Sequence, residues 1–300
     1  SLAAFARSDL AFPEPLSKTL SLYLMCAIGL KGGVLVAENG ITQDLILAAA
    51  AGLFLSCLIP FAAFYVLRSF GRLDATNAAA VAAHYGSVSV VTFIAGNQIL
   101  TDTGTPPAGY MIAVLALMET PAIVVGLFLA SRYAAENLNR NKDLLRETLL
   151  NGSVVLLLGS FVIGMIIGKD GFEPVSPVFE TGFTGLLCLF LLDMGLVAAR
   201  RLRNAKVLNL RHVILGIAFP IVNGTLGCVI GILLGLDAGT STTLGILGAS
   251  ASYIAVPAAI RIALPKADPG LYLTMSLAIT FPFNILVGIP IYVSIVNFLV

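Results

Sequence analysis

Two short segments of small and hydroxyl-bearing residues, 163 residues apart, are the part of this sequence best suited to binding a ligand. The first tetrad is Gly86-Ser87-Val88-Ser89 and the second tetrad is Ala249-Ser250-Ala251-Ser252. A Leu-Asp-Ala triplet precedes each tetrad, at residues 73–75 and 236–238, so the two regions are copies of one pattern. Small residues let a backbone approach a ligand closely, and hydroxyls and free backbone amides donate hydrogen bonds to an anion.

Both tetrads lie in the middle of apolar segments long enough to span a membrane. Lipid gives an unpaired backbone amide no water, so a helix is interrupted there only where it lines a cavity or binds a ligand. If both helices break at their tetrads and cross, two helix N-termini face each other near the bilayer centre and favour a small oxyanion. Close helix packing would explain one tetrad alone, but the repetition favours a site. We therefore predict an anion site, with tetrads less than about 15 Å apart, formed by Gly86, Ser87, Val88, Ser89, Ala249, Ser250, Ala251 and Ser252.

Of the 16 carboxylates, only Glu119 and Asp193 lie well inside apolar segments. A charge there costs several kcal/mol unless it is paired or ligated. Glu119 precedes Thr120 and Pro121, and the proline leaves one backbone carbonyl free, so oxygen atoms converge on a hard cation such as sodium. Proton carriage and a structural hydrogen bond are the alternatives for Glu119. Asp193 lies about one turn from a basic cluster that begins at Arg200, so an ion pair explains it as well as a transport role does.

The predicted sodium site uses oxygen atoms from several segments. Thr280 and Asn284 flank Pro282 and form the uncharged counterpart of the Glu119 segment in the second half of the chain. The predicted sodium ligands are Glu119, Thr92, Thr120, Ser252, Ser276 and Thr280. His84 lies two residues before the first tetrad, and we expect a packed, hydrogen-bonded histidine rather than a proton carrier.

The composition indicates which elements hold these residues. With 58% hydrophobic and 11% charged residues and a mean hydropathy of +0.97, the chain is an integral membrane protein. Its apolar runs are continuous rather than alternating, which excludes a β-barrel and predicts an all-α fold. We expect nine spans, at residues 15–36, 44–67, 75–99, 108–130, 148–168, 177–198, 212–235, 240–263 and 270–298.

Charge gives the orientation of these spans. With residues 131–147 in the cytoplasm, 15 of the 17 basic residues lie inside and only Lys31 and Lys169 lie outside, as the positive-inside rule requires. The segment 131–147 is the long polar linker of the chain. Glycine pairs four residues apart, such as Gly29/Gly33, predict close helix packing within a subunit or between subunits.

The spans form an incomplete repeat. Residues 15–36 match 177–198 and 75–99 match 240–263, whereas 148–168 has no partner. A five-plus-five repeat needs one more helix before residue 15, so we expect that most of the first helix is missing from this chain. The predicted organisation is a first inverted repeat at 1–130, the linker at 131–147 and a second inverted repeat at 148–300. Paired interrupted spans in such repeats are typical of secondary transporters, whose binding site they form.

Several motifs, in one order and at one spacing, extend over nearly the whole chain. They are residues 28–33, 81–89, 118–121, 194–195 and 249–252, followed by Arg261, residues 267–269, Tyr272, Ser276 and Pro282. Together they resemble the sodium-dependent bicarbonate symporters best known from the cyanobacterial carbon-concentrating mechanism. The chain departs from that family in its short linker, its partial first helix and the glutamate at position 119, where the family has aspartate.

The resemblance implies ten helices in two inverted repeats, a core domain with two crossed discontinuous helices, and a gate domain that forms a homotrimer. It also implies uptake of bicarbonate coupled to the sodium ion, a location in the inner (plasma) membrane, and inhibition by a PII-like protein on the cytoplasmic face.

Three other functions remain open from the sequence: a symporter of another small organic anion, a cation/proton antiporter of the same fold, and a non-transporting membrane sensor. The small residues of the tetrads favour a compact substrate. Neither an HExxH nor a Gly-x-Ser-x-Gly motif is present, so we expect no enzyme, and no nucleic-acid partner is expected.

Overall fold

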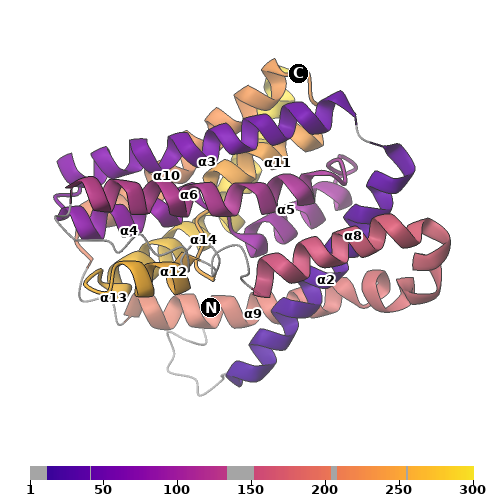
Figure 1. Cartoon of the computed structure of the whole chain (residues 1–300), viewed down its shortest axis with the longest axis horizontal. Helices are drawn as coiled ribbons and strands as arrows, with labels where there is room; N and C mark the ends of the chain where they lie inside the picture. Colours follow the sequence, from indigo (N-terminus) through magenta and orange to yellow (C-terminus); the bar gives the residue numbers. More distant parts are fainter. Residues whose placement is uncertain (1–11, 41, 134–151, 204–207, 255) are drawn as a thin grey trace.

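The computed structural model describes residues 12–40, 42–133, 152–203, 208–254 and 256–300, and all regular elements among them are helices. Figure 1 shows long helices lying roughly along one axis, with shorter ones between them. The first half of the chain contains α2 (Glu14–Asn39), α3 (Gln43–Ser69), α4 (Ala75–Gly86), α5 (Val90–Asp102) and α6 (Met111–Tyr133). The second half begins with α8 (Gly152–Phe172), the short turns η1 (Glu173–Val175) and η2 (Pro177–Thr181), and α9 (Phe183–Arg203).

The second half continues with α10 (Leu210–Leu233), α11 (Ala238–Ala249) and α12 (Val256–Ala263). Its last segment is a continuous helical run made of α13 (Pro269–Leu273), η3 (Thr274–Thr280), α14 (Phe281–Phe283), η4 (Asn284–Gly288) and α15 (Ile289–Leu299). The η3 and η4 turns are the wider π-helical type and lie on either side of Pro282, which has no amide hydrogen to give to the preceding turn.

Eight helical stretches among the described residues are long and apolar enough to cross a membrane, which confirms the all-helical membrane class. They coincide with eight of the nine predicted spans, and α4 and α5 together form one of them. The ninth, residues 240–263, consists of α11, with 12 residues, and α12, with 8, and each is too short to cross alone. Residues 1–11, where the remaining part of the expected first helix would lie, and most of the predicted linker, from residue 134 onward, lie outside the described residues.

The Leu-Asp-Ala triplets begin the two helices that carry the tetrads. The Asp74 carboxylate accepts a hydrogen bond of 3.0 Å from the Asn77 amide at the start of α4. The Asp237 carboxylate accepts one of 2.9 Å from the Thr240 amide at the start of α11. The repeated sequence pattern is therefore a pair of N-caps, which satisfy otherwise unpaired amides at the two helix starts.

The helices form two groups. In the first group α2 packs on α8 and α9, and in the second α3, α4 and α6 pack together, as do α10, α11 and α15. In Figure 1 the labels of α2, α8 and α9 lie at the lower right, and those of α3, α6 and α10 at the upper left. A Cβ atom built on Gly33 would lie 2.0 Å from the Phe161 carbonyl oxygen, and one on Gly164 would lie 2.2 Å from that of Leu30. These glycines therefore bring α2 and α8 together within one chain.

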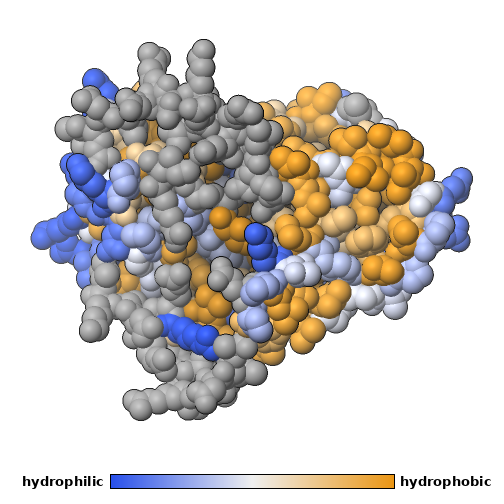
Figure 2. Space-filling view, turned by 60° about the horizontal axis from the view of Figure 1, so that its bottom comes forward, coloured by the Kyte–Doolittle hydropathy of each residue, from blue (hydrophilic) through white to orange (hydrophobic). Residues whose placement is uncertain are grey.

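The surface agrees with a membrane-spanning orientation along the long axis. Figure 2 shows hydrophilic residues at the two ends of this axis and mostly hydrophobic residues on the coloured surface between them. Many large apolar side chains among the described residues are well exposed, including Ile166 at 78% and Leu233 at 80%. A lipid environment would cover such a belt, because a water-soluble monomer rarely exposes so large an apolar surface.

Candidate functional site

Both helices that carry a tetrad are broken there, as predicted. The α4 helix ends at Gly86 and α5 begins at Val90, while α11 ends at Ala249 and α12 begins at Val256. Ser87 follows α4 and Ser250 follows α11, and both have an extended backbone. The angles are φ −87° and ψ 164° at Ser87, and φ −78° and ψ 160° at Ser250. Equivalent serines therefore turn the chain out of the helix in the same way.

The two breaks contact each other directly. The Ser89 amide donates a hydrogen bond of 2.9 Å to the Ser250 hydroxyl, and the Ser252 amide donates one of 2.9 Å to the His84 carbonyl oxygen. The prediction that the tetrads lie close together is thus confirmed. Two amides that we expected to bind an anion are instead paired with protein atoms, because the crossing brings each amide to an acceptor of the opposite helix.

The Ser87 hydroxyl in the first tetrad has no hydrogen-bond partner among the described residues. Ser87 corresponds to Ser250 in the repeat, yet the Ser87 hydroxyl is fully buried and makes no hydrogen bond within the described part of the chain. The Ser250 hydroxyl, in contrast, accepts from Ser89 and donates to the Leu247 carbonyl oxygen at 2.8 Å. A buried hydroxyl without a partner costs about 1–3 kcal/mol, so Ser87 is a candidate for ligand binding.

Two further hydrogen bonds hold the broken helices together at their outer ends. The Asp268 amide, after α12, donates to the Asn77 side-chain oxygen at 2.8 Å. The Ala108 amide, after α5, donates to the Thr240 hydroxyl at 3.0 Å. Asn77 and Thr240 occupy the same place in the two copies of the pattern, three residues after the capping aspartate. Each copy therefore binds the loop that follows the other copy, and we call these two bonds the reciprocal ties.

A small cavity lies where the two breaks meet. Its volume is about 10 Å³, close to the minimum that holds one water molecule. It is lined by Met25, Val88, Ser89, Val90, Glu119, Ser252, Tyr253 and Ile254. Because Val90 is the first residue of α5, the positive N-terminal end of that helix faces this central cavity.

Glu119 on α6 is the acidic residue of the central cavity. Its side chain is only 3% exposed, and no hydrogen bond or ion pair joins it to another described residue. Ser89 and Ser252 line the same cavity from the two breaks. A carboxylate and two hydroxyls around a cavity of this size form a set of hard oxygen ligands suited to a small cation.

The structure places the other predicted sodium ligands away from this cavity. The Thr92 hydroxyl donates to the Ser89 hydroxyl at 3.0 Å and so lies directly behind a lining residue. Ser276 donates to the Tyr272 carbonyl oxygen at 2.8 Å, and Thr280 donates to that of Gly216 at 2.7 Å. Thr120 is half-buried and does not line the cavity. Of the predicted anion residues, Val88, Ser89 and Ser252 line it, whereas Gly86, Ser87, Ala249, Ser250 and Ala251 do not.

Several residues at the site were missed by the sequence reasoning. Met25, Tyr253 and Ile254 line the cavity, and only Tyr253 and Ile254 carried a signal, namely their position directly after the second tetrad. The sequence named Asn284 only as part of the counterpart of the Glu119 segment. Its amide nitrogen donates to the Ala249 carbonyl oxygen at 2.9 Å and so holds the end of α11. Its side-chain oxygen accepts from the Tyr292 hydroxyl at 3.1 Å, so Asn284 positions the second break.

The other two candidates behave differently from each other. His84 is fully buried, its Nδ1 donates to the Ala80 carbonyl oxygen at 2.7 Å, and its ring stacks on Tyr272 at 4.5 Å. The histidine is packed and hydrogen-bonded through Nδ1, as expected, while its buried Nε2 has no partner among the described residues. Asp193 is buried, forms no ion pair with a described residue, and has one carboxylate oxygen without a hydrogen bond. The side chains of residues 201–207 lie outside those that the structure describes, so the ion pair between Asp193 and the basic cluster stays a prediction.

Comparison with known families agrees with the resemblance of the motifs. Residues 1–297 match the profile of the Na+-dependent bicarbonate transporter superfamily. The chain belongs to this superfamily. No individual curated protein matches the chain. Membership in the Na+-dependent bicarbonate transporter superfamily and eight membrane-length helices together make it a multi-pass membrane protein, as predicted. A transporter family is also consistent with the expectation that the chain is not an enzyme.

Proposed function

We propose that this chain imports bicarbonate together with sodium by alternating access, and that the central cavity is its binding site. The observation that supports this most strongly is a buried carboxylate, Glu119, at the meeting point of two broken helices. Neither a broken helix nor an unpaired carboxylate is stable at mid-membrane without a compensating ligand. Family membership supplies the identity of the two solutes.

Sodium is the solute that fits a cavity of this size. Glu119, Ser89 and Ser252 offer oxygen ligands around about 10 Å³. A cation there would neutralise the Glu119 carboxylate and remove the cost of burying an unpaired charge. We therefore propose Glu119 as the main sodium ligand, with Ser89 and Ser252 beside it and Thr92 supporting Ser89.

Bicarbonate has four non-hydrogen atoms and needs more room than the central cavity offers. We propose that its site opens next to the sodium site when the side chains of Met25 and Tyr253 move. The N-terminal end of α5 and the unpaired Ser87 hydroxyl are the groups that would receive the anion. Without sodium, the Glu119 carboxylate repels the anion, and sodium removes this repulsion. That electrostatic step couples the two solutes.

The inverted repeats, at 1–130 and 148–300, are part of this proposal. The reciprocal ties and the matching breaks are what a pseudo-two-fold axis through the central cavity would produce. On this interpretation the crossed helices belong to a core domain and α2, α8 and α9 to a gate domain. The homotrimer and the PII-like regulator remain predictions from the resemblance, which native mass spectrometry with and without a PII-like protein would test.

The direct test is uptake of labelled bicarbonate into proteoliposomes at a fixed membrane potential, with and without an inward sodium gradient. We expect sodium-dependent accumulation of bicarbonate, and little competition from acetate or sulfate. Preference for acetate would indicate a symporter of another small anion, and coupling to protons would indicate an antiporter. Binding of bicarbonate without any accumulation would favour the non-transporting sensor and contradict the proposal.

A further inference from the structure

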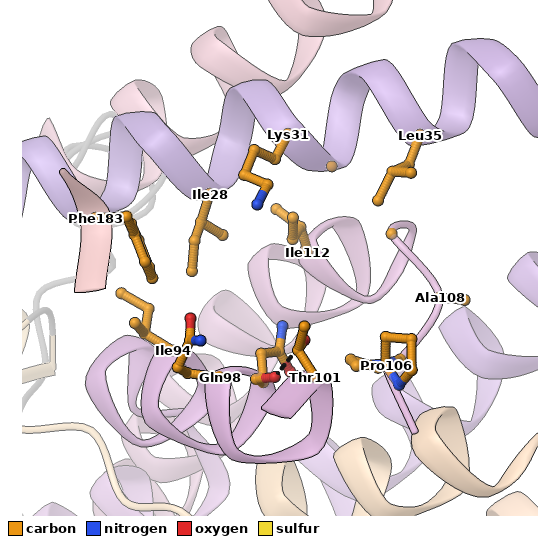
Figure 3. Close-up of a pocket in the computed structure, with 14 residues that line it drawn as sticks. Ile28, Lys31, Leu35, Ile94, Gln98, Thr101, Pro106, Ala108, Ile112 and Phe183 are labelled. Atoms are coloured by element: carbon orange, nitrogen blue, oxygen red, sulfur yellow. Dashed lines mark hydrogen bonds between the residues drawn. The ribbon is translucent and has the colours of Figure 1, made fainter. Parts of the chain in front are cut away.

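A second, larger cavity of about 300 Å³ lies between α2, α5, the start of α6 and the first residue of α9. Figure 3 shows the Lys31 side chain pointing from α2 into this space, with Gln98 and Thr101 of α5 on the opposite wall. We call this space the outer cavity. Pro106 and Ala108, in the loop after α5, close one side of it.

The outer cavity lies directly outward of the central cavity. Met25 of the central cavity and Ile28 of the outer cavity are three residues apart on α2, and Val90 and Ile94 are four residues apart on α5. At 1.5 Å per residue, the two spaces are separated by about one helical turn on both helices. These four side chains are all buried and apolar, so they form a thin closed layer between the two cavities.

Charge distinguishes the outer cavity from an ordinary packing gap. Lys31 is the charged residue among those that line it. Its ammonium group lies 3.2 Å from the carboxylate of Glu180, which does not line the cavity. Both side chains are nearly half exposed, at 43% and 47%, so solvent reaches the pair. Lys31 therefore faces the cavity, while Glu180 does not line it. A second carboxylate, that of Asp102, accepts a hydrogen bond of 2.8 Å from the lining residue Gln98 and also does not line the cavity.

We propose that the outer cavity is the entrance through which a small inorganic oxyanion reaches the central cavity from outside, and that Lys31 attracts the anion there. This inference rests on the proposed function. A fixed cation on the wall of a cleft raises the local concentration of anions and their rate of arrival. Glu180 weakens this attraction, because it offsets the charge of Lys31 at close range. Substitutions of the two residues should therefore act in opposite directions.

The first test measures the KM for bicarbonate in proteoliposomes at fixed sodium and low ionic strength. Lys31→Gln should raise this KM about threefold or more, and Glu180→Gln should lower it. Both differences should shrink when choline chloride is added, because salt screens exposed charges. Lys169→Gln is the matched control, since Lys169 is the other basic residue predicted outside, is exposed on α8 and does not line the cavity. An unchanged KM in Lys31→Gln would overturn the proposal.

The second test does not depend on transport. The thiol of a Gln98→Cys variant is treated in intact vesicles with membrane-impermeant methanethiosulfonates, one anionic and one cationic, and the reaction of the parent protein is subtracted. Adding Lys31→Gln should reduce the ratio of anionic to cationic labelling severalfold, and adding Lys169→Gln should not. Loss of bicarbonate uptake in the parent protein would refute the proposed function, yet this ratio would still test the entrance. The proposal that the outer cavity is the entrance would be refuted if the thiol reacted with neither reagent. It would also be refuted if the labelling ratio were the same with and without Lys31→Gln.

Discussion

Ser87 and Ser250 occupy equivalent positions in the repeat, but only one of them is used by the protein. Ser250 joins the two breaks through the Ser89 amide, whereas the Ser87 hydroxyl is buried without a partner in the described chain. Two serines at equivalent positions therefore have different roles. One positions the site, and the other remains available to a ligand.

Replacing Ser87 with alanine should weaken bicarbonate binding without affecting the fold. The lost hydrogen bond is worth about 0.5–1.5 kcal/mol, so we expect the KM for bicarbonate to rise up to about tenfold at an unchanged melting temperature. Ser250→Ala removes the acceptor of the Ser89 amide and should lower the melting temperature as well. The double variant should lose uptake. Ser294→Ala, an exposed hydroxyl on α15, is the control. A Ser87→Ala variant with wild-type KM would exclude Ser87 from the site.

Replacing Glu119 with glutamine should separate sodium binding from folding. The sodium concentration for half-maximal uptake should rise at least about tenfold, and the affinity for bicarbonate should fall with it, because binding linkage is reciprocal. In wild-type protein, sodium should raise the melting temperature, since a ligand of the folded state stabilises it. This sodium-dependent increase should disappear in Glu119→Gln. If the increase persists, Glu119 is a structural residue.

At this scale the sequence identified the residue types better than their partners. A carboxylate inside a membrane span is energetically costly, and the serine tetrads are repeated. Both features can be recognised from a single sequence. The hydrogen bonds that the Ser252 amide donates to His84 and the Thr280 hydroxyl donates to Gly216 depend on how distant helices pack. Met25 looks like any apolar residue of a span, so no sequence signal could have placed it at the cavity.

At the scale of elements, the close packing of α2 on α8 depends on glycines, which have no side chain. Gly164 lies against the backbone of Leu30, and a Cβ atom there would be 2.2 Å from a carbonyl oxygen, which cannot move without shifting the helix. Gly159, five residues earlier on the same helix, offers a natural comparison, because a Cβ atom added to it would meet no neighbouring atom within 4 Å.

Gly164→Ala should lower the free energy of unfolding by about 1–3 kcal/mol, as expected for overpacking. Gly159→Ala should leave it unchanged or raise it by up to about 1 kcal/mol, because alanine favours a helix more than glycine does. Thermal unfolding of both variants in detergent measures the difference. Equal melting temperatures would show that α2 and α8 do not pack as described.

The helix breaks could be predicted from sequence because two independent copies gave the same pattern. The lengths and positions of the helices on either side of each break could not be predicted. Residues 240–263 form a single apolar run, and nothing in their hydropathy indicates that the second piece, α12, is only 8 residues long. The π-helical turns around Pro282 were likewise not predicted, since they depend on contacts made by the whole last segment.

At the scale of the whole molecule, the distribution of basic residues by itself predicts the orientation of the chain in the membrane. Thr103, in the loop after α5, should face the outside, and Ser69, at the end of α3, should face the cytoplasm; both are exposed. In intact cells, an impermeant thiol reagent should label Thr103→Cys but not Ser69→Cys. Permeabilised cells should show labelling of both. The reverse pattern would invert the topology and place the outer cavity on the cytoplasmic side.

In the proposed transport cycle, the reciprocal ties limit how the central cavity exchanges its contents between the two sides of the membrane. Bonds at Asn77 and Thr240 fasten the outer ends of the crossed helices, and the bonds of Ser89 and Ser252 fasten their middles. Separating the two helices would break all four bonds, and the bonds of Ser89 and Ser252 lie at buried residues where water does not replace them. Translation of the crossed pair as one rigid body past α2, α8 and α9 would break none of them. The distances within the site would then stay constant while its depth in the bilayer changes.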